Sequence, residues 1–276
     1  MKSLTDAILL PTRLITNLEN ADFECSSEDR SRLLTVVVVG GGFAGVETIA
    51  SVNDFVREAI RYYPRLTADE LRIILIEAGT AILPELGPKL GLYAQKKLTQ
   101  RGVEFRMKTE VKSVSDSEVR LSDASTIETN LLVWTAGVSP NPLLNTLECS
   151  KERGRLITNE FLEVEGFPGV WALGDCAAVP DLSTGKTCPP TAQHALRQGK
   201  IVADNILASI SGGRRRAFRF KTIGALASIG KRTGVARILG VNFSGFVAWW
   251  LWRTIYLSKL PRFEKKVRVA LDWARV

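Results

Sequence analysis

The sequence is poor in the residues that build metal centres and disulfide frameworks. It holds four cysteines and one histidine, His194, among 276 residues. Cys25, Cys149, Cys176 and Cys188 are widely separated and form no C-x-x-C pair, which excludes a zinc ribbon, a dithiol redox centre and a disulfide scaffold. We therefore expect no metal site and an intracellular protein with reduced thiols.

Long uncharged apolar segments are also lacking. The longest one in the C-terminal part, Ile238–Trp252, has 15 residues, whereas a membrane-spanning helix needs about 20. Asp6 and Pro11 interrupt the region where a secretory signal would place its apolar core. The net charge of +8 is uneven: residues 214–276 carry fifteen Lys/Arg against two acids, a net +13, which leaves −5 for the rest. The basic character belongs to the C-terminal segment alone.

Two apolar, β-branched runs dominate the first half of the chain. Leu33–Val39 and Leu71–Glu77 have the composition of strands buried on both faces of a parallel sheet. Helical spacing predicts a helix over Val46–Tyr63 and another over Pro88–Arg101. Shorter strand-like segments follow around residues 103–107, 118–121 and 127–134. Alternation of strand and helix at this spacing predicts a doubly wound α/β fold with right-handed crossovers.

A glycine-rich turn, G-x-G-x-x-G, follows the first of these runs and precedes a helix. In such a turn Gly40 permits the tight bend, Gly42 lets backbone approach a pyrophosphate, and Gly45 lets the helix pack close to the strand. Glu77 ends the second run, where a carboxylate would bind the adenosine ribose and repel a 2′-phosphate, so NADH is favoured over NADPH. An unliganded turn and a solvated Glu77 are the alternatives.

Four further segments resemble those of type II NADH:quinone oxidoreductases, which are FAD-dependent members of the pyridine nucleotide oxidoreductase superfamily. These segments are Val133–Gly137, Gly169–Ala177, Thr191–Gly199 and the tail from Phe243 to Trp273. The resemblance covers nearly the whole chain and implies a flavoprotein fold with two dinucleotide-binding domains.

The resemblance implies a partial flavin site. Gly174 and Asp175 match the Gly-Asp pair whose aspartate hydrogen-bonds the ribityl chain of FAD. Ala192 and Gln193 match the helix start that lies against the isoalloxazine, and Gln193 matches the glutamine near the quinone head. For His194, a structural role at the helix start is favoured.

The resemblance also implies a reaction in which NADH reduces the flavin and the flavin reduces a membrane quinone. Glu47 matches the family's acid beside the nicotinamide and the flavin, and a structural role as a helix acid favoured by the dipole is the alternative. Ala136 and Gly137 match the hinge that leaves the NAD(H)-binding domain.

The chain is expected to divide into four regions. Residues 1–32 resemble a connecting helix left from an FAD domain, and 33–137 form the NAD(H)-binding domain. Residues 138–212 are the C-terminal part of the FAD domain, and 213–276 are a basic, aromatic tail. Nothing before Thr35 resembles the family's own FAD-binding glycine loop. A truncated gene model, a split protein and a degenerate form are three open explanations. A separate FAD-domain chain or a homodimer partner could supply the missing half.

The tail is expected to associate with membranes. Tryptophans at 249, 250 and 252 lie among apolar residues and are flanked by Lys/Arg, which suits an interfacial helix with an apolar face over Phe243–Leu257, bound to anionic lipid. Packing of this aromatic face on the protein's own core or on a second subunit is the alternative. We expect a peripheral protein on the cytoplasmic (inner) face of the membrane and no nucleic-acid partner. Two other functions stay open: a non-catalytic, membrane-associated NADH-binding module, and a disulfide reductase of the same superfamily, although residues 33–137 contain no cysteine.

Overall fold

The computed structural model describes residues 4–137 and 139–274, so Val138, the first residue of the expected third region, lies outside the described part. The chain forms two compact units. Unit 1 consists of Met1–Ala136 with Ile223–Val276, and unit 2 consists of Gly137–Thr222. The C-terminal segment from Ile223 therefore packs with the first half of the chain.

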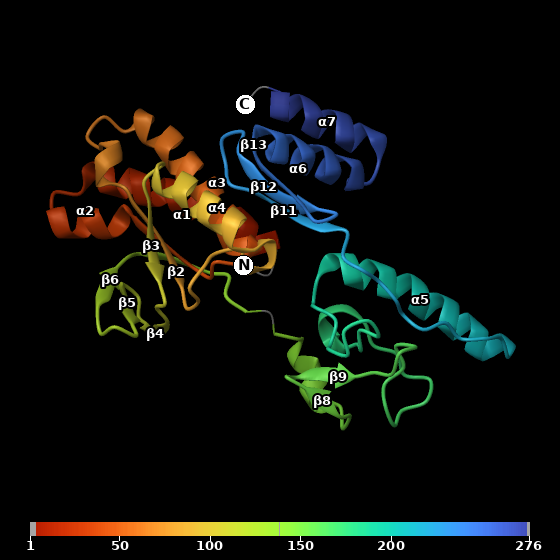
Figure 1. The fold of residues 1–276 in the computed structure, drawn as a ribbon. Helices are drawn as coiled ribbons and strands as arrows, with labels where there is room; N and C mark the ends of the chain where they lie inside the picture. Colours follow the sequence, from red (N-terminus) through yellow and green to blue (C-terminus); the bar gives the residue numbers. More distant parts are fainter. Residues whose placement is uncertain (1–3, 138, 275–276) are drawn as a thin grey trace. The chain divides into compact units, whose positions relative to one another are not determined.

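Unit 1 contains a four-stranded parallel sheet with the order β3-β2-β1-β7 (Figure 1). Its strands are β1 (Thr35–Val39), β2 (Arg72–Glu77), β3 (Val103–Met107) and β7 (Leu131–Trp134). All of β1 and the middle of β2 are buried, because helices cover one face of the sheet and a second sheet covers the other. The expected parallel α/β sheet, with the two apolar runs at its centre, is confirmed. The expected doubly wound arrangement is wrong for this unit, because an antiparallel sheet and not a helix layer covers the second face.

Three helices of unit 1 pack on one face of this sheet. They are α1 (Leu4–Phe23), α3 (Phe43–Ala59) and α4 (Pro88–Thr99), and the short helix α2 (Ser27–Leu33) follows α1. Leu14 of α1, Ile49 of α3 and Leu98 of α4 are buried in the same core as Val36 of β1. The segment expected as one connecting helix is thus two helices that belong to unit 1. They are separated where the Ser26 side chain caps α2 by accepting the Asp29 N–H.

An antiparallel sheet covers the opposite face. Its strands are β4 (Val111–Val114), β5 (Glu118–Leu121) and β6 (Thr126–Glu128). Val119 and Ile127 share a core with Val37 and Ile74. The single strand expected over 127–134 is two strands, because the buried Thr129 turns the chain and donates its hydroxyl to the Thr35 carbonyl at 2.6 Å. Short 3-10 helices complete this part: η1 (Ile60–Tyr62), η2 (Ala68–Glu70) and η3 (Pro84–Leu86).

The C-terminal segment differs from the expected tail. It forms an antiparallel sheet followed by two helices: β11 (Gly224–Ser228), β12 (Gly234–Ile238), β13 (Val241–Gly245), α6 (Phe246–Lys259) and α7 (Phe263–Ala274). The prediction of helix from Phe243 is wrong, because Phe243 lies in β13. Gly230 and Gly240, both with positive φ, lie in the turns between the strands of this segment. A Cβ at Gly234 would contact the backbone of α6, so glycine at this position lets the helix pack closely on the sheet.

This sheet is part of the unit 1 core. Ala227, Ile229 and Val235 are fully buried among the residues of α3 and β1. Small side chains on β11 and β12 allow that close packing. The prediction that 213–276 form a separate tail is therefore wrong for β11 and β12, which a truncation at Gly213 would remove from the core.

Unit 2 has its own small core around Leu156, Leu162, Val179 and Val202. Its elements are η4 (Pro142–Thr146), β8 (Lys151–Glu152), β9 (Arg155–Ile157), η5 (Gly174–Cys176), β10 (Ala177–Ala178) and α5 (Ala192–Ser211). The expected helix over 191–210 is confirmed as α5. Thr191 caps its start and Gly212, with φ +69°, ends it.

Candidate functional site

The glycine loop lies between β1 and the start of α3. Gly40 has φ +108°, and a Cβ there would lie 2.9 Å from the Ala136 nitrogen. A Cβ at Gly45 would overlap the carbonyl oxygen of Gly40, so α3 packs directly on the loop. By contrast, nothing lies within 4 Å of a Cβ at Gly42. The loop is therefore closely packed at both ends and open at Gly42, as pyrophosphate binding at a helix N-terminus requires.

The end of β7 packs against this loop. The Thr135 hydroxyl donates to the Val39 carbonyl at 2.6 Å, and the Trp134 indole donates to the Ala136 carbonyl at 2.8 Å. These bonds place Ala136 beside Gly40. Gly137 follows as the first residue of unit 2, with φ +76°.

Glu77 ends β2 beside the loop. One carboxylate oxygen accepts the Gly41 N–H at 2.5 Å, and the other accepts the Gly79 N–H at 2.6 Å. The side chain is partly exposed, and each oxygen keeps a second lone pair for a ribose hydroxyl. Glu77 thus braces the glycine loop, a role that its position in the sequence does not indicate.

Glu47 lies on α3, one turn beyond the loop, and faces the C-terminal segment. Its Oε1 accepts the Ser228 N–H at 3.0 Å and the Trp252 indole N–H at 2.8 Å. Burial raises the pKa of Glu47 above its usual range, and the two hydrogen bonds lower it in part. Trp252, expected among the membrane-facing aromatic residues, is therefore hydrogen-bonded within unit 1.

Asp54 repeats this arrangement two turns along α3. It accepts the Lys231 N–H at 2.9 Å and forms an ion pair with Arg101. Residues seven apart lie on one face of a helix, so Glu47 and Asp54 together hold the C-terminal sheet on α3. Burial lowers the pKa of Arg101.

In unit 2, the Gly-Asp turn is fixed to α5. The Gly174 N–H donates to Oε1 of Gln198 at 2.8 Å, and the Gln198 side chain is almost fully buried. The turn is the short helix η5, in which Asp175 is exposed. The Asp175 carboxylate is therefore accessible beside a rigid backbone.

Ala192 and Gln193 form the first turn of α5, where the helix start presents backbone N–H groups. His194 is 4% exposed, and its Nδ1 lies 2.7 Å from the Thr191 hydroxyl. Its ring packs edge-on against Phe220, and burial lowers its pKa. These contacts agree with a structural role for His194.

The site residues thus form two groups. Unit 1 brings together Gly40, Gly42, Gly45, Glu77 and Ala136 at one end of its sheet, with Glu47 one helical turn away. Unit 2 brings together the Gly174-Asp175 turn and the start of α5. Among the side chains that the structure describes, no group of three His, Cys, Asp or Glu residues could hold a metal ion.

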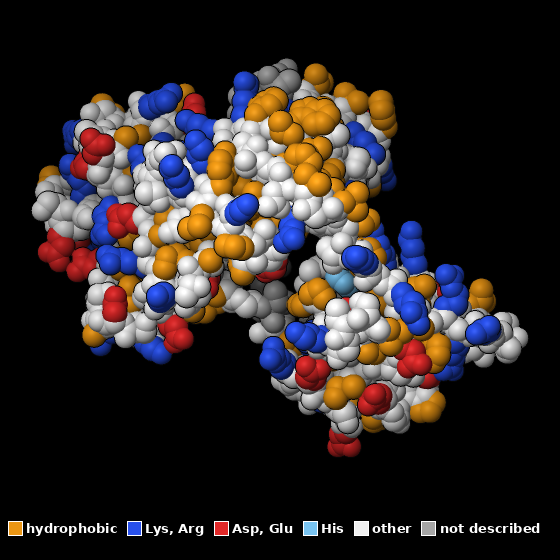
Figure 2. All heavy atoms as spheres, in the orientation of Figure 1, with side chains coloured by type: hydrophobic (Ala, Val, Ile, Leu, Met, Phe, Trp, Pro, Cys, Tyr) orange, Lys and Arg blue, Asp and Glu red, His pale blue; other side chains and the backbone are white. Residues whose placement is uncertain are grey.

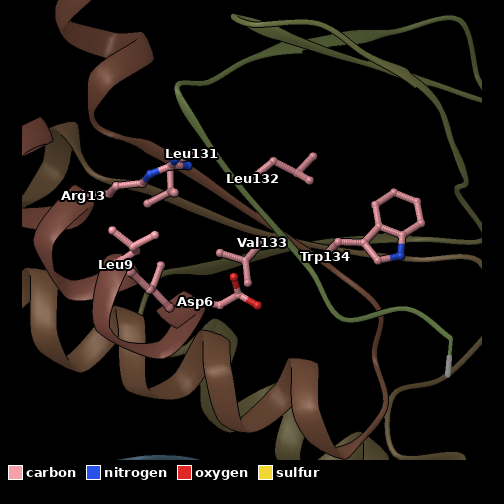
Figure 3. A pocket seen from close by; sticks show the side chains of 8 residues that line it. Asp6, Leu9, Arg13, Leu131, Leu132, Val133 and Trp134 are labelled. Carbon is pink, nitrogen blue, oxygen red and sulfur yellow. The ribbon is translucent and has the colours of Figure 1, made fainter. Parts of the chain in front are cut away.

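A separate groove of about 240 Å³ lies between α1 and the edge strand β7 (Figure 3). Leu9 and Arg13 line it from α1 and Val133 lines it from β7, while the Trp134 indole points away from the α1 side chains. None of the glycine-loop residues lines this groove.

Comparison with protein families matches residues 12–199 to the pyridine nucleotide-disulphide oxidoreductase family and residues 223–276 to the NDH2 C-terminal domain. The chain therefore belongs to the pyridine nucleotide-disulphide oxidoreductases, in their type II NADH:quinone oxidoreductase (NDH2) branch. The resemblance inferred from the sequence motifs is confirmed.

Two curated relatives match along the whole chain. The probable NADH dehydrogenase of Dictyostelium discoideum is 34% identical over 100% of this chain and 61% of its own length. The type II NADH:quinone oxidoreductase Ndh of Mycobacterium tuberculosis is 33% identical over 99% of this chain and 60% of its own. The chain thus spans about 60% of the length of these curated relatives.

A solved structure shares the fold. The chain is similar to NDH2 from Plasmodium falciparum in complex with NADH, with a TM-score of 0.91 and 19% sequence identity over 99% of this chain and 72% of that one. At this identity the likeness concerns the NDH2 fold alone.

Proposed function

We propose that this chain supplies the NADH-binding domain and part of the flavin site of an FAD-dependent NADH:quinone oxidoreductase. The observation that carries the proposal is the glycine loop. It is packed closely at Gly40 and Gly45, open at Gly42, and braced by Glu77 at the carboxyl end of the neighbouring strand. The matched relatives, one named a probable NADH dehydrogenase and the other a type II NADH:quinone oxidoreductase, support the same function.

The loop and Glu77 would divide the recognition of NADH between them. Backbone at Gly42 and the positive end of α3 would bind the pyrophosphate. The Glu77 carboxylate, held in place by the Gly41 and Gly79 N–H groups, would accept the ribose hydroxyls. Its negative charge disfavours a 2′-phosphate, so the proposed substrate is NADH.

The residues of unit 2 fit the flavin half of FAD. Asp175 presents an exposed carboxylate next to a backbone that Gln198 fixes, and such a group is suited to ribityl hydroxyls. Ala192 and Gln193 would lie against the ring at the α5 start. Bound FAD would accept hydride from NADH and pass electrons to a quinone. The chain's own part is to bind and orient the two redox partners.

The purified 276-residue chain is expected to bind NADH, to retain far less than one FAD per chain, and to turn over NADH and quinone at less than about one per second. The sequence contains one G-x-G-x-x-G loop, whereas NADH and the ADP half of FAD each need one. Flavin absorbance, NADH titration by fluorescence and a quinone-reduction assay measure the three quantities. Stoichiometric flavin with turnover of several per second would contradict the prediction. Absence of NADH binding would refute the proposed function itself.

We also propose that α6 and α7 bind a membrane surface containing anionic lipid, which would make the protein peripheral on the cytoplasmic (inner) face. Within residues 4–137 and 139–274, no helix has the length and hydropathy needed to cross a bilayer. Apolar side chains gather over α6 and α7 in Figure 2. The exposed ones include Phe246, Val247, Trp250, Phe263, Val267 and Leu271. Lysine and arginine residues of α7 lie between them in the sequence, which suits an interfacial helix.

Replacing Phe263, Val267 and Leu271 together by serine is expected to reduce binding to anionic vesicles by at least about tenfold, since each apolar side chain contributes on the order of 1 kcal/mol or more. The three lie at i, i+4 and i+8 on the exposed side of α7. Vesicle flotation measures the effect. Serine at Leu207 and Ile210, two exposed residues of α5 in unit 2, is the matched control. Unchanged flotation of the triple variant would contradict the proposal.

A further inference from the structure

Trp252 is the feature of the C-terminal segment that the membrane proposal leaves unexplained. Its neighbour Trp250 is 53% exposed, whereas the Trp252 indole donates to the Glu47 carboxylate at 2.8 Å. Glu47 and Trp252 are 205 positions apart in the sequence. A tryptophan N–H bonded to a partly buried carboxylate is a charge-assisted hydrogen bond, which is stronger than a neutral one.

Both donors to Glu47 reach the same oxygen. The Ser228 N–H from β11 and the indole N–H from α6 are both bonded to Oε1. Among the residues that the structure describes, none donates a hydrogen bond to Oε2. A carboxyl group whose one oxygen already accepts two N–H groups takes a proton on the other oxygen. Its first oxygen then continues to accept both bonds as a carbonyl.

We propose that Trp252 is a positioning residue for Glu47: with the Ser228 amide it holds Oε1, so that Oε2 alone takes up and releases a proton. The carboxyl group then changes its protonation state while the C-terminal sheet and α6 stay attached to α3. The inference rests on the proposed function only in placing this acid one turn from the NADH loop.

The surroundings of Glu47 give the direction of the effect. Burial raises the pKa of Glu47, and the Ser228 and Trp252 donors oppose that rise. Tyr256 on α6 has its own pKa raised by burial and by the negative charge of Glu47. Strand β11 contributes no charged side chain, and α6 carries two cations, Arg253 and Lys259. Removing the indole donor therefore destabilises the charged carboxylate and raises the pKa of Glu47 further.

The test follows the carboxyl C=O stretching band of the 276-residue chain by infrared spectroscopy against pH, without nucleotide, flavin or lipid. The variant Glu47→Gln identifies the band by its loss. In Trp252→Phe, which keeps an aromatic ring and removes the N–H, the midpoint of this band should move up by about one pH unit. Trp250→Phe, the same change at an exposed site on the same helix, should leave it in place. Equal midpoints in the two phenylalanine variants would overturn the proposal.

A second measurement uses the unmodified chain, in case Trp252→Phe does not fold. In a ¹⁵N-labelled sample, one of the six tryptophan indole resonances should shift with pH at the midpoint of the carboxyl band, and Glu47→Gln should abolish that shift. If no indole resonance follows the carboxyl group, the proposal is wrong. Because neither experiment contains NADH, a failure of the proposed function would be seen separately, in the nucleotide titration.

Discussion

The variant Gly42→Val is expected to fold normally and to bind NADH at least about tenfold more weakly, a loss of about 1.4 kcal/mol or more. A side chain at this position meets no protein atom within 4 Å, and the backbone there is extended, with φ −73°. The new methyl groups would instead fill the space through which a pyrophosphate approaches the backbone. Stability should change by no more than about 1 kcal/mol, which is the scale of losing glycine at a helix N-cap.

Gly45→Ala is the contrasting variant in the same loop. Its Cβ would overlap the Gly40 carbonyl oxygen, so the backbone of α3 or of the loop must move. We expect a marked fall in thermal stability, as for other substitutions that overpack a core. NADH titration and thermal unfolding of both variants separate binding from folding. If Gly42→Val binds NADH as well as the unchanged chain, the nucleotide does not lie on this loop.

The pair Glu77→Ser with Ala78→Arg is expected to reverse the nucleotide preference. The unchanged chain should bind NADH at least about tenfold more tightly than NADPH, because the Glu77 carboxylate repels a 2′-phosphate. In the double variant that repulsion is gone, and an arginine at the exposed position 78 offers the phosphate two parallel hydrogen bonds. Total affinity should also fall somewhat, since the Gly41 and Gly79 N–H groups lose their acceptor.

Fluorescence titration with both nucleotides measures this preference. Ala78→Arg alone is the matched control: Glu77 remains to neutralise the new arginine, so NADPH should stay the weaker ligand. Equal affinity of the unchanged chain for NADH and NADPH would show that Glu77 serves only to brace the loop.

The parallel sheet was predictable because strands that are buried on both faces consist almost entirely of apolar residues. β1 and β2 are continuous apolar runs that need no knowledge of their partners. The strands of the C-terminal sheet contain no such apolar run. They contain glycine, alanine and serine, such as Gly224-Ala225-Leu226-Ala227-Ser228. Only Ala227 of β11 and residues 234–236 of β12 are buried, because α3 and α6 pack closely on small side chains there. Short strands of this kind show neither an apolar run nor a clear alternation.

The candidate site likewise has residues that the sequence predicted and contacts that it did not. The loop glycines and Glu77 were found from local spacing, since a turn between strand and helix is specified by neighbouring residues. The bonds of Glu47 to Ser228 and Trp252 were not found, because 181 and 205 residues separate the partners. The spacing of seven between Glu47 and Asp54 indicates that both acids lie on one face of α3. It does not identify the residues of the C-terminal segment that these acids bind.

Completion of the unit 1 core by β11 and β12 has a consequence for synthesis of the chain. Val133 and Val235 are buried in the same core, yet about 100 residues are translated between them. At the usual 5–20 residues per second, the ribosome needs roughly 5–20 s to make that stretch. During this interval the α3 face that later binds β11 has no partner from its own chain. The nascent domain therefore passes through a period of exposed apolar surface, in which it is more prone to aggregation than the finished chain.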